Sequence, residues 1–132
     1  MKEERKVRAT ENVAMHREPA TSGGQRMTFQ RRFSSAGVDP YATVEWERRD
    51  AVIQGEGGKI VFEQRGVEFP ASWSQLATNV VTSKYFRGPL GKPQRETSVR
   101  QLLSRVVGTI VGWGETQGYF STAEDRDVFR DE

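Results

Sequence analysis

The chain has 132 residues, of which 35% are hydrophobic, and its formal net charge is +2 at pH 7. This length corresponds to one domain, and the hydrophobic share is below that of a typical compact domain, so we expect part of the chain to be disordered or to need a partner. The absence of cysteine excludes disulfides, zinc–thiolate sites and thiol nucleophiles, and no apolar run approaches the ~18 residues of a membrane-spanning helix.

Residues 1–30 contain few large apolar side chains and a Ser-Gly-Gly break at 22–24. Such a segment buries too little surface to offset its ordering entropy, which predicts a disordered, flexible arm. The arm contains His16, the only histidine, and the local sequence supplies no further ligands for a metal. Its start lacks the apolar core of a secretory signal, which favours a cytoplasmic protein.

Two runs of alternating apolar residues flank a glycine-rich turn at 54–58. Alternation with period two is typical of strands, and glycine tolerates the positive φ of a tight turn. We therefore expect a β-hairpin in which residues 43–54 pair with 59–69. Val44 and Trp46 are predicted to share its inward face.

A first helix is predicted over residues 72–84, because Ser72 and Gln75 have the spacing of a capping box and apolar residues follow at helical spacing. The predicted inward face consists of Trp73, Leu76, Ala77, Val80 and Val81, with Thr78, Asn79 and Thr82 off that face. Glycines and prolines then predict a loop over 87–96.

A second helix is predicted to begin at Thr97 or Ser98, where Ser98 and Gln101 repeat the capping-box spacing. Its apolar stripe is the cleanest in the sequence and consists of Val99, Leu102, Leu103, Val106, Val107, Ile110 and Val111. Gly108 and Gly112 lie four residues apart on this helix, and we expect a neighbouring element to pack closely at both.

A third helix is predicted to begin after Ser121, which has Glu124 at capping-box spacing, and Val128 and Phe129 begin its apolar face. The sequence stops at Glu132 without a C-cap, so we expect this helix to be cut. The predicted fold class is α+β, mainly α: a β-hairpin followed by two or three packed amphipathic helices, with a flexible N-terminal arm.

The candidate contact residues are Lys84, Tyr85, Phe86 and Arg87, at the start of the first inter-helix loop. Cationic and aromatic side chains of this kind can contact nucleotide phosphate or another protein surface. The alternative, which the frequent packing of aromatics after a helix favours, has Tyr85 and Phe86 covering the core with Lys84 and Arg87 in solvent. No residue is predicted to be catalytic or to bind a cofactor or metal.

Three long blocks of the sequence resemble the N-terminal region of adenosylcobalamin-dependent (class II) ribonucleotide reductases. They are GVDPYATVEWERRDAVI at 37–53, VFEQRGVEFPASWSQLATNVVTSKYFRGPLG at 61–91, and SVRQLLSRVVGTIVGWGETQGYF at 98–120. The resemblance covers about three quarters of the chain, from about residue 33 to Glu132, and leaves out the arm.

The resemblance implies an enzyme that reduces ribonucleotides to deoxyribonucleotides for DNA synthesis inside a ten-stranded α/β barrel. Adenosylcobalamin would generate a cysteine thiyl radical there, and two further cysteines would supply the reducing electrons. This sequence has no cysteine, so we expect residues 31–132 to be an N-terminal accessory domain truncated before the catalytic barrel. Alone it is expected to be inactive as a ribonucleoside-diphosphate reductase and to bind no cofactor, with the barrel as its partner.

Two alternatives stay open at this point. One is a free-standing interaction module derived from the same enzyme. The other is a small nucleic-acid-binding domain, since basic residues interleaved with aromatics suit single strands, although the small net charge weighs against it. The residues for that function would be Arg31, Arg32, Lys84, Tyr85, Arg87, Lys92 and Arg95.

Overall fold

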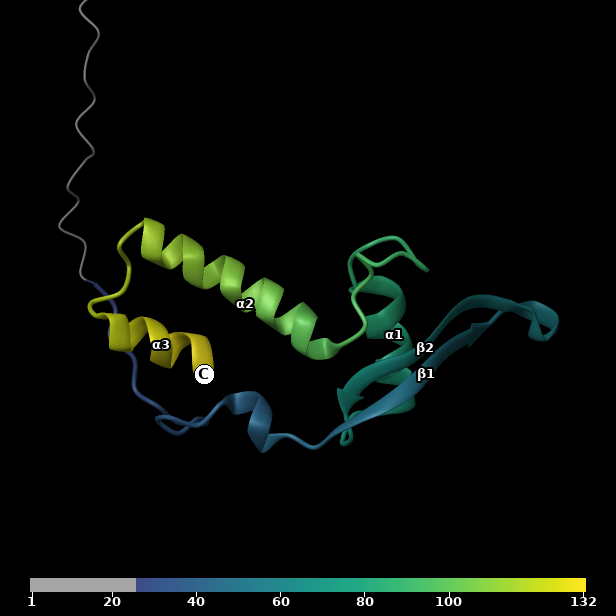
Figure 1. Cartoon of the computed structure of the whole chain (residues 1–132), viewed down its shortest axis with the longest axis horizontal. Helices are drawn as coiled ribbons and strands as arrows, with labels where there is room; N and C mark the ends of the chain where they lie inside the picture. Colours follow the sequence, from purple (N-terminus) through teal and green to yellow (C-terminus); the bar gives the residue numbers. More distant parts are fainter. Residues whose placement is uncertain (1–25) are drawn as a thin grey trace, which may run out of the picture.

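A computed structural model describes residues 26–132 and confirms the α+β fold (Figure 1). In chain order the elements are η1 (Pro40–Thr43), β1 (Trp46–Gln54), η2 (Glu56–Gly58), β2 (Ile60–Pro70), α1 (Gln75–Lys84), α2 (Val99–Thr116) and α3 (Ala123–Asp131). The predicted arm up to residue 25, with His16, lies outside the described residues. No helix within 26–132 is long and apolar enough to cross a membrane.

β1 and β2 form the predicted hairpin, a two-stranded antiparallel sheet. Trp46 pairs with Pro70 at one end and Gln54 with Ile60 at the other, and the register shifts at two places along β1. The turn between the strands places Gly57 and η2 at the tip, where φ of Gly57 is +70°. The tip projects away from the helices (Figure 1), so only the base of the hairpin reaches the core.

The main core lies where the base of the hairpin meets α1 and the beginning of α2. Its buried side chains are Ala51, Val67, Phe69, Phe86 and Val99, with Trp46, Phe62, Val81 and Leu102 packed around them. The beginning of α2 is joined to β2 by polar contacts as well: Glu68 N–H donates to the Thr97 carbonyl at 2.8 Å, and the Ser98 hydroxyl donates to the Glu68 carboxylate at 2.7 Å.

The inward face predicted for α1 is wrong at Leu76 and Val80, although Val81 packs against the core. Thr78 and Thr82 are fully buried, whereas Leu76 is 73% exposed and Val80 is 43% exposed. The reason is the open edge of β1, whose backbone carbonyls need donors. Polar side chains of α1 supply them, because the Asn79 amide donates to the Val52 carbonyl at 3.1 Å.

Arg49 on β1 also forms hydrogen bonds with the polar face of α1 and with the residues just before it. Its guanidinium donates to the Thr78 hydroxyl at 3.1 Å and to the Ala71 carbonyl at 2.8 Å, and it also bonds the Trp73 carbonyl. The N-cap of α1 is Ser74, two residues after the predicted one, and its side chain accepts from the Ala77 amide.

α2 begins at the predicted N-cap, Ser98, but its apolar stripe is buried mainly at its two ends. Val99 lies in the main core and Val111 is 7% exposed near α3, while Leu103, Val106 and Ile110 stay exposed between them. The close packing predicted at Gly108 and Gly112 is not found: within residues 26–132, no atom lies within 4 Å of a Cβ built at either position. The close approach occurs instead at Gly114, where a Cβ would lie 2.6 Å from the Phe120 ring.

α3 begins one residue later than predicted, with Thr122 as its N-cap and Asp125 as the capping partner. Residues 26–34 run alongside it (Figure 1), and we call this segment the strap. Met27 forms a parallel bridge with Phe120, and the Phe29 amide donates to the Asp125 carboxylate at 2.9 Å. The last residues assigned to the arm therefore contact α3, and the domain boundary at residue 30 stays a prediction.

Candidate functional site

The loop between α1 and α2, residues 85–98, is organised by the guanidinium of Arg95. This group donates to the Thr82 carbonyl at 2.5 Å, the Phe86 carbonyl at 2.6 Å and the Gly88 carbonyl at 3.1 Å. Its remaining bond, to the Gln64 side chain at 2.9 Å, joins the loop to β2. The loop thus has one fixed shape, since its carbonyls converge on a single charged donor.

Glu96 fixes the other side of the loop. Its carboxylate accepts from the Arg105 guanidinium at 2.7 Å and from the Arg87 backbone amide at 2.8 Å. The Arg105 hydrogen bond is the main reason that the pKa of Glu96 lies below its usual range, against the opposing effect of burial. Glu96 and Arg105 are both charged at neutral pH, so their ion pair stabilises the shape of the loop.

Of the four candidate contact residues, only Phe86 is a core residue. It is 5% exposed, and its ring lies 5.8 Å from that of Phe69. Tyr85 is 61% exposed, so the expectation that it covers the core is wrong. Lys84 and Arg87 are exposed, as that interpretation expected.

The basic residues nominated for nucleic-acid binding do not form one surface. Arg95 uses its guanidinium inside the loop, and Arg31 pairs with Asp131 at 2.9 Å. The loop precedes α2, whereas Arg31 lies beside α3, which follows the other end of α2 (Figure 1). Lys84 at the end of α1 is left as an exposed cation, together with Arg87 and Lys92 on the loop that follows.

An exposed apolar stripe runs along α2 and is formed by Leu103, Val106, Ile110 and Trp113, which we call the α2 stripe. These residues are 36%, 40%, 44% and 61% exposed, respectively. They recur at helical spacing on one face, so the stripe is continuous over about three turns. An apolar strip of this length on a helix indicates a surface made to be covered.

Within residues 26–132, no three His, Cys, Asp or Glu side chains lie close enough to hold a metal ion. The groups whose pKa values are shifted are held by ion pairs or capping bonds, such as Asp127 beside Arg126 and Asp125 under the Phe29 amide. These contacts account for the shifted pKa values of the two aspartates.

Sequence reasoning missed the residues that hold the hairpin, α1 and the inter-helix loop together, namely Arg49, Arg95, Glu96 and Arg105. Apart from Glu47, which is two residues from Arg49, the partners of their side chains lie between 7 and 31 residues away in the chain, and local spacing carries no signal for such contacts. One local cue did exist: Arg95 and Glu96 sit between two glycine–proline turns and a helix N-cap, where a charged pair can satisfy loose carbonyls and amides.

Comparison with known proteins gives a consistent result. A family model described as class II vitamin B12-dependent ribonucleotide reductase matches residues 47–132. A vitamin B12-dependent ribonucleotide reductase of Streptomyces coelicolor is 47% identical over 117 residues, covering 88% of this chain and 12% of the relative. The corresponding protein of Rhodopirellula baltica is 51% identical over 105 residues, covering 78% of this chain and 10% of the relative. A more distant one, from Agrobacterium fabrum, is 31% identical over 140 residues. The chain thus spans about one eighth or less of the length of these relatives.

Proposed function

The chain belongs to the class II vitamin B12-dependent ribonucleotide reductase family, and from that premise we propose that it is a structural module in the N-terminal region of such an enzyme. Its role is to pack against the catalytic part of the protein. The observation that carries this proposal is the α2 stripe, which no described residue covers.

Burial energy supports this role. Each large aliphatic or aromatic side chain contributes roughly 1.5–3 kcal/mol when it moves from water to an apolar contact. The four side chains of the α2 stripe are between 36% and 61% exposed, so covering them supplies several kcal/mol to an interface. That gain, together with the exposed contact residues of the loop, is the source of the affinity that we expect between the module and the catalytic part.

The reduction of ribonucleotides is proposed for the full-length enzyme, with its radical cysteines and its barrel outside these residues. Adenosylcobalamin, which the names of the relatives imply, would supply the radical chemistry there. Residues 26–132 contain neither histidine nor cysteine and so offer the cobalt no imidazole or thiolate ligand, and we propose that the cofactor is held outside them. We therefore assign no step of the reaction to this module, and a cytoplasmic location is part of the same proposal.

Lys84, Tyr85 and Arg87 enter the proposal as contact residues. They stand exposed on a loop whose shape is fixed from within by Arg95, so their positions require little ordering on contact. We assign them to the surface between the module and the barrel. Phe86 is a structural residue, because its ring lies in the core.

A binding experiment tests the proposal. The probe is the Streptomyces coelicolor reductase from which the 117 matched residues are removed, titrated with the 132-residue chain by calorimetry. We expect saturable binding that Val106→Glu and Ile110→Glu each weaken about tenfold or more, since a charge buried in an apolar contact costs at least ~1.4 kcal/mol. Gln101→Glu is the matched control, because position 101 is turned roughly 140° from Val106 on the helix.

Far-UV circular dichroism of each variant shows whether α2 still forms. Equal binding by the wild type and both stripe variants would refute the packing role of the stripe. Absence of any binding by the wild type would favour the free-standing interaction module, which makes no contact with the barrel.

A further inference from the structure

A groove of about 590 Å³ lies between η1, the middle of α2 and the end of α3. Its walls are mostly apolar, and its rim is charged. The apolar lining residues are Pro40, Tyr41, Val44, Trp46, Pro70, Trp73, Leu103 and Val107, and the charged ones are Asp39, Arg130, Asp131 and Glu132. Volumes of this size are typical of sites that take a large side chain or a small molecule, well above the space of a packing defect.

One wall of the groove is held rigidly. The Tyr41 hydroxyl lies 3.0 Å from the Ser104 hydroxyl, and the Trp46 indole N–H donates to the Tyr41 carbonyl at 2.8 Å. The guanidinium of Arg100 covers the Trp46 ring at 4.4 Å. Because the polar atoms of both aromatics are satisfied within the wall, the surface left for the groove is apolar.

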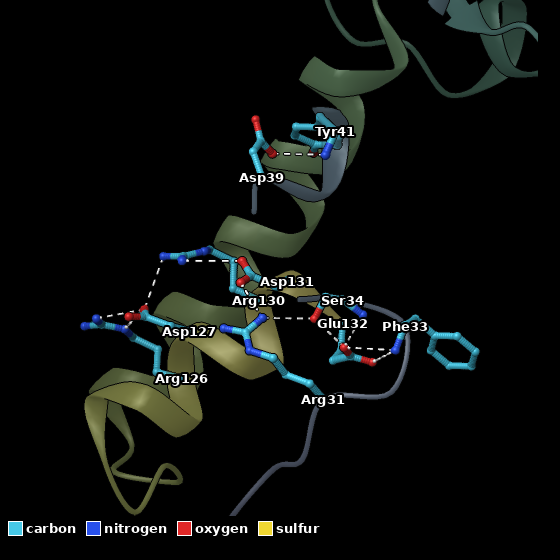
Figure 2. Close-up of polar contacts among 10 residues, drawn as sticks. All are labelled: Arg31, Phe33, Ser34, Asp39, Tyr41, Arg126, Asp127, Arg130, Asp131 and Glu132. Atoms are coloured by element: carbon cyan, nitrogen blue, oxygen red, sulfur yellow. Dashed lines mark hydrogen bonds and ion pairs between the residues drawn. The ribbon is translucent and has the colours of Figure 1, made fainter. Parts of the chain in front are cut away.

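The opposite wall, the end of α3, is held by the strap. Arg31 pairs with Asp131 at 2.9 Å, and the Glu132 carboxylate accepts from the Phe33 amide at 3.0 Å and the Ser34 amide at 2.8 Å. Figure 2 shows these contacts gathered on one side of the end of α3, with Asp39 and Tyr41 across from them. The groove is thus formed before any partner arrives.

The rim is acidic, and one carboxylate on it is not paired. Asp131 is neutralised by Arg31 and Arg130, and Glu132 is engaged by backbone amides. Asp39 is exposed, uses one oxygen to accept from the Tyr41 amide at 3.0 Å, and makes no ion pair within residues 26–132. The groove therefore presents an apolar floor beside a carboxylate that is in no ion pair within residues 26–132, while Arg130 on the same rim is engaged by Asp127 and Asp131.

We infer that this groove is a second docking point, which takes an apolar side chain of the catalytic part of the reductase together with a neighbouring lysine or arginine. The inference rests on the proposed packing function. Leu103 belongs both to the α2 stripe and to the groove, so a surface laid on the stripe continues into the groove. The apolar side chain fills the space against Val107 and the aromatic wall, and the cation pairs with Asp39.

The experiment uses the same probe and titration as the packing test. Val107→Glu places a charge in the groove and is expected to weaken binding about tenfold, as for a buried anchor. Asp39→Asn keeps the oxygen that caps Tyr41 and removes the charge. It is expected to weaken binding about threefold and to lower its dependence on salt concentration. The control for charge is Glu56→Gln in η2, at the hairpin tip, which should leave binding unchanged.

A photo-crosslinking residue at Val44, on the groove rim, provides a measurement that does not depend on a disruptive variant. Mass spectrometry should find it joined to a segment in which an apolar residue is adjacent to lysine or arginine. Weakening by Val106→Glu combined with unchanged binding for Val107→Glu and Asp39→Asn would overturn the docking groove while leaving the packing function intact. Crosslinks confined to acidic segments, or none at all in a saturated complex, would overturn it as well.

Discussion

Replacing Arg95 by alanine should destabilise the loop between α1 and α2. The guanidinium serves three backbone carbonyls and the Gln64 side chain at distances of 2.5 to 3.1 Å. A hydrogen bond to a charged group contributes ~1.5–3 kcal/mol, but these four share one side chain and the freed carbonyls become partly hydrated, so the bonds do not add. We expect Arg95→Ala to lower the free energy of unfolding by about 2–4 kcal/mol.

The assay is urea unfolding of the whole chain followed by circular dichroism. With a slope of ~2 kcal/mol per molar urea, in the middle of the usual range, the loss corresponds to a midpoint lower by about 1–2 M. Arg95→Lys should recover less than half of it, because an ammonium cannot serve carbonyls in several directions as a planar guanidinium does. The matched control is Arg87→Ala on the same loop, where the side chain makes no hydrogen bond within residues 26–132. A loss for Arg95→Ala within about 0.5 kcal/mol of that control would refute the role of the guanidinium.

Five further substitutions, compared in three experiments, test the packing and the strap. Gly114→Ala should destabilise the chain by about 1–3 kcal/mol, because its Cβ would meet an aromatic ring at 2.6 Å, whereas Gly108→Ala should stabilise it by up to about 1 kcal/mol through helix propensity. Both are measured by thermal unfolding, and equal shifts would contradict the assignment of the close contact. Thr82→Val should be neutral or stabilising, since its buried hydroxyl has no hydrogen-bond partner within residues 26–132. Thr78→Val should lower the free energy of unfolding by about 1 kcal/mol, because it removes the hydroxyl that accepts from Arg49. The reverse order in urea midpoints would be inconsistent with the burial of that face. The pKa of Glu132 is lowered to about 2 by the strap hydroxyl and amides, so its contribution to stability is complete above the unfolded pKa near 4.5 and is lost as the pH falls towards 2. In Glu132→Gln the melting temperature should vary less between pH 4.5 and 2 than in the wild type, and identical profiles would exclude the carboxylate as the source.

The order and type of the elements could be predicted because they depend on local chemistry. Glycines at the hairpin tip, capping residues before the helices and apolar spacing each act over a few residues. The N-cap at Ser98 followed directly from this, and the cap before α3 was displaced by one residue because Thr122 offers the same hydroxyl.

The inward faces could not be predicted in the same way, because they depend on what lies opposite. An apolar stripe on α1 was expected to face the core, yet the free carbonyls of β1 and the Arg49 guanidinium brought Thr78 and Asn79 inward instead. The candidate site shows the same limit. Phe86 and Tyr85 are adjacent aromatics at a helix end, and only the position of Phe69 decides which of them is buried.

The strap determines the order in which this chain can fold. The hydrogen bonds of the strap join residues 96 to 100 positions apart, from Phe29, Arg31 and Ser34 to the residues of α3 and its C-cap. They close a ring of main chain that contains the hairpin, α1 and α2. Closing so long a ring of main chain costs conformational entropy, and this cost is smaller when contacts within the ring have already formed. The hairpin and the beginning of α2 should therefore assemble first, and the ring should close last. The wall of the groove that α3 supplies is then completed only in the final step of folding, so the docking groove is present only on molecules whose core has already formed.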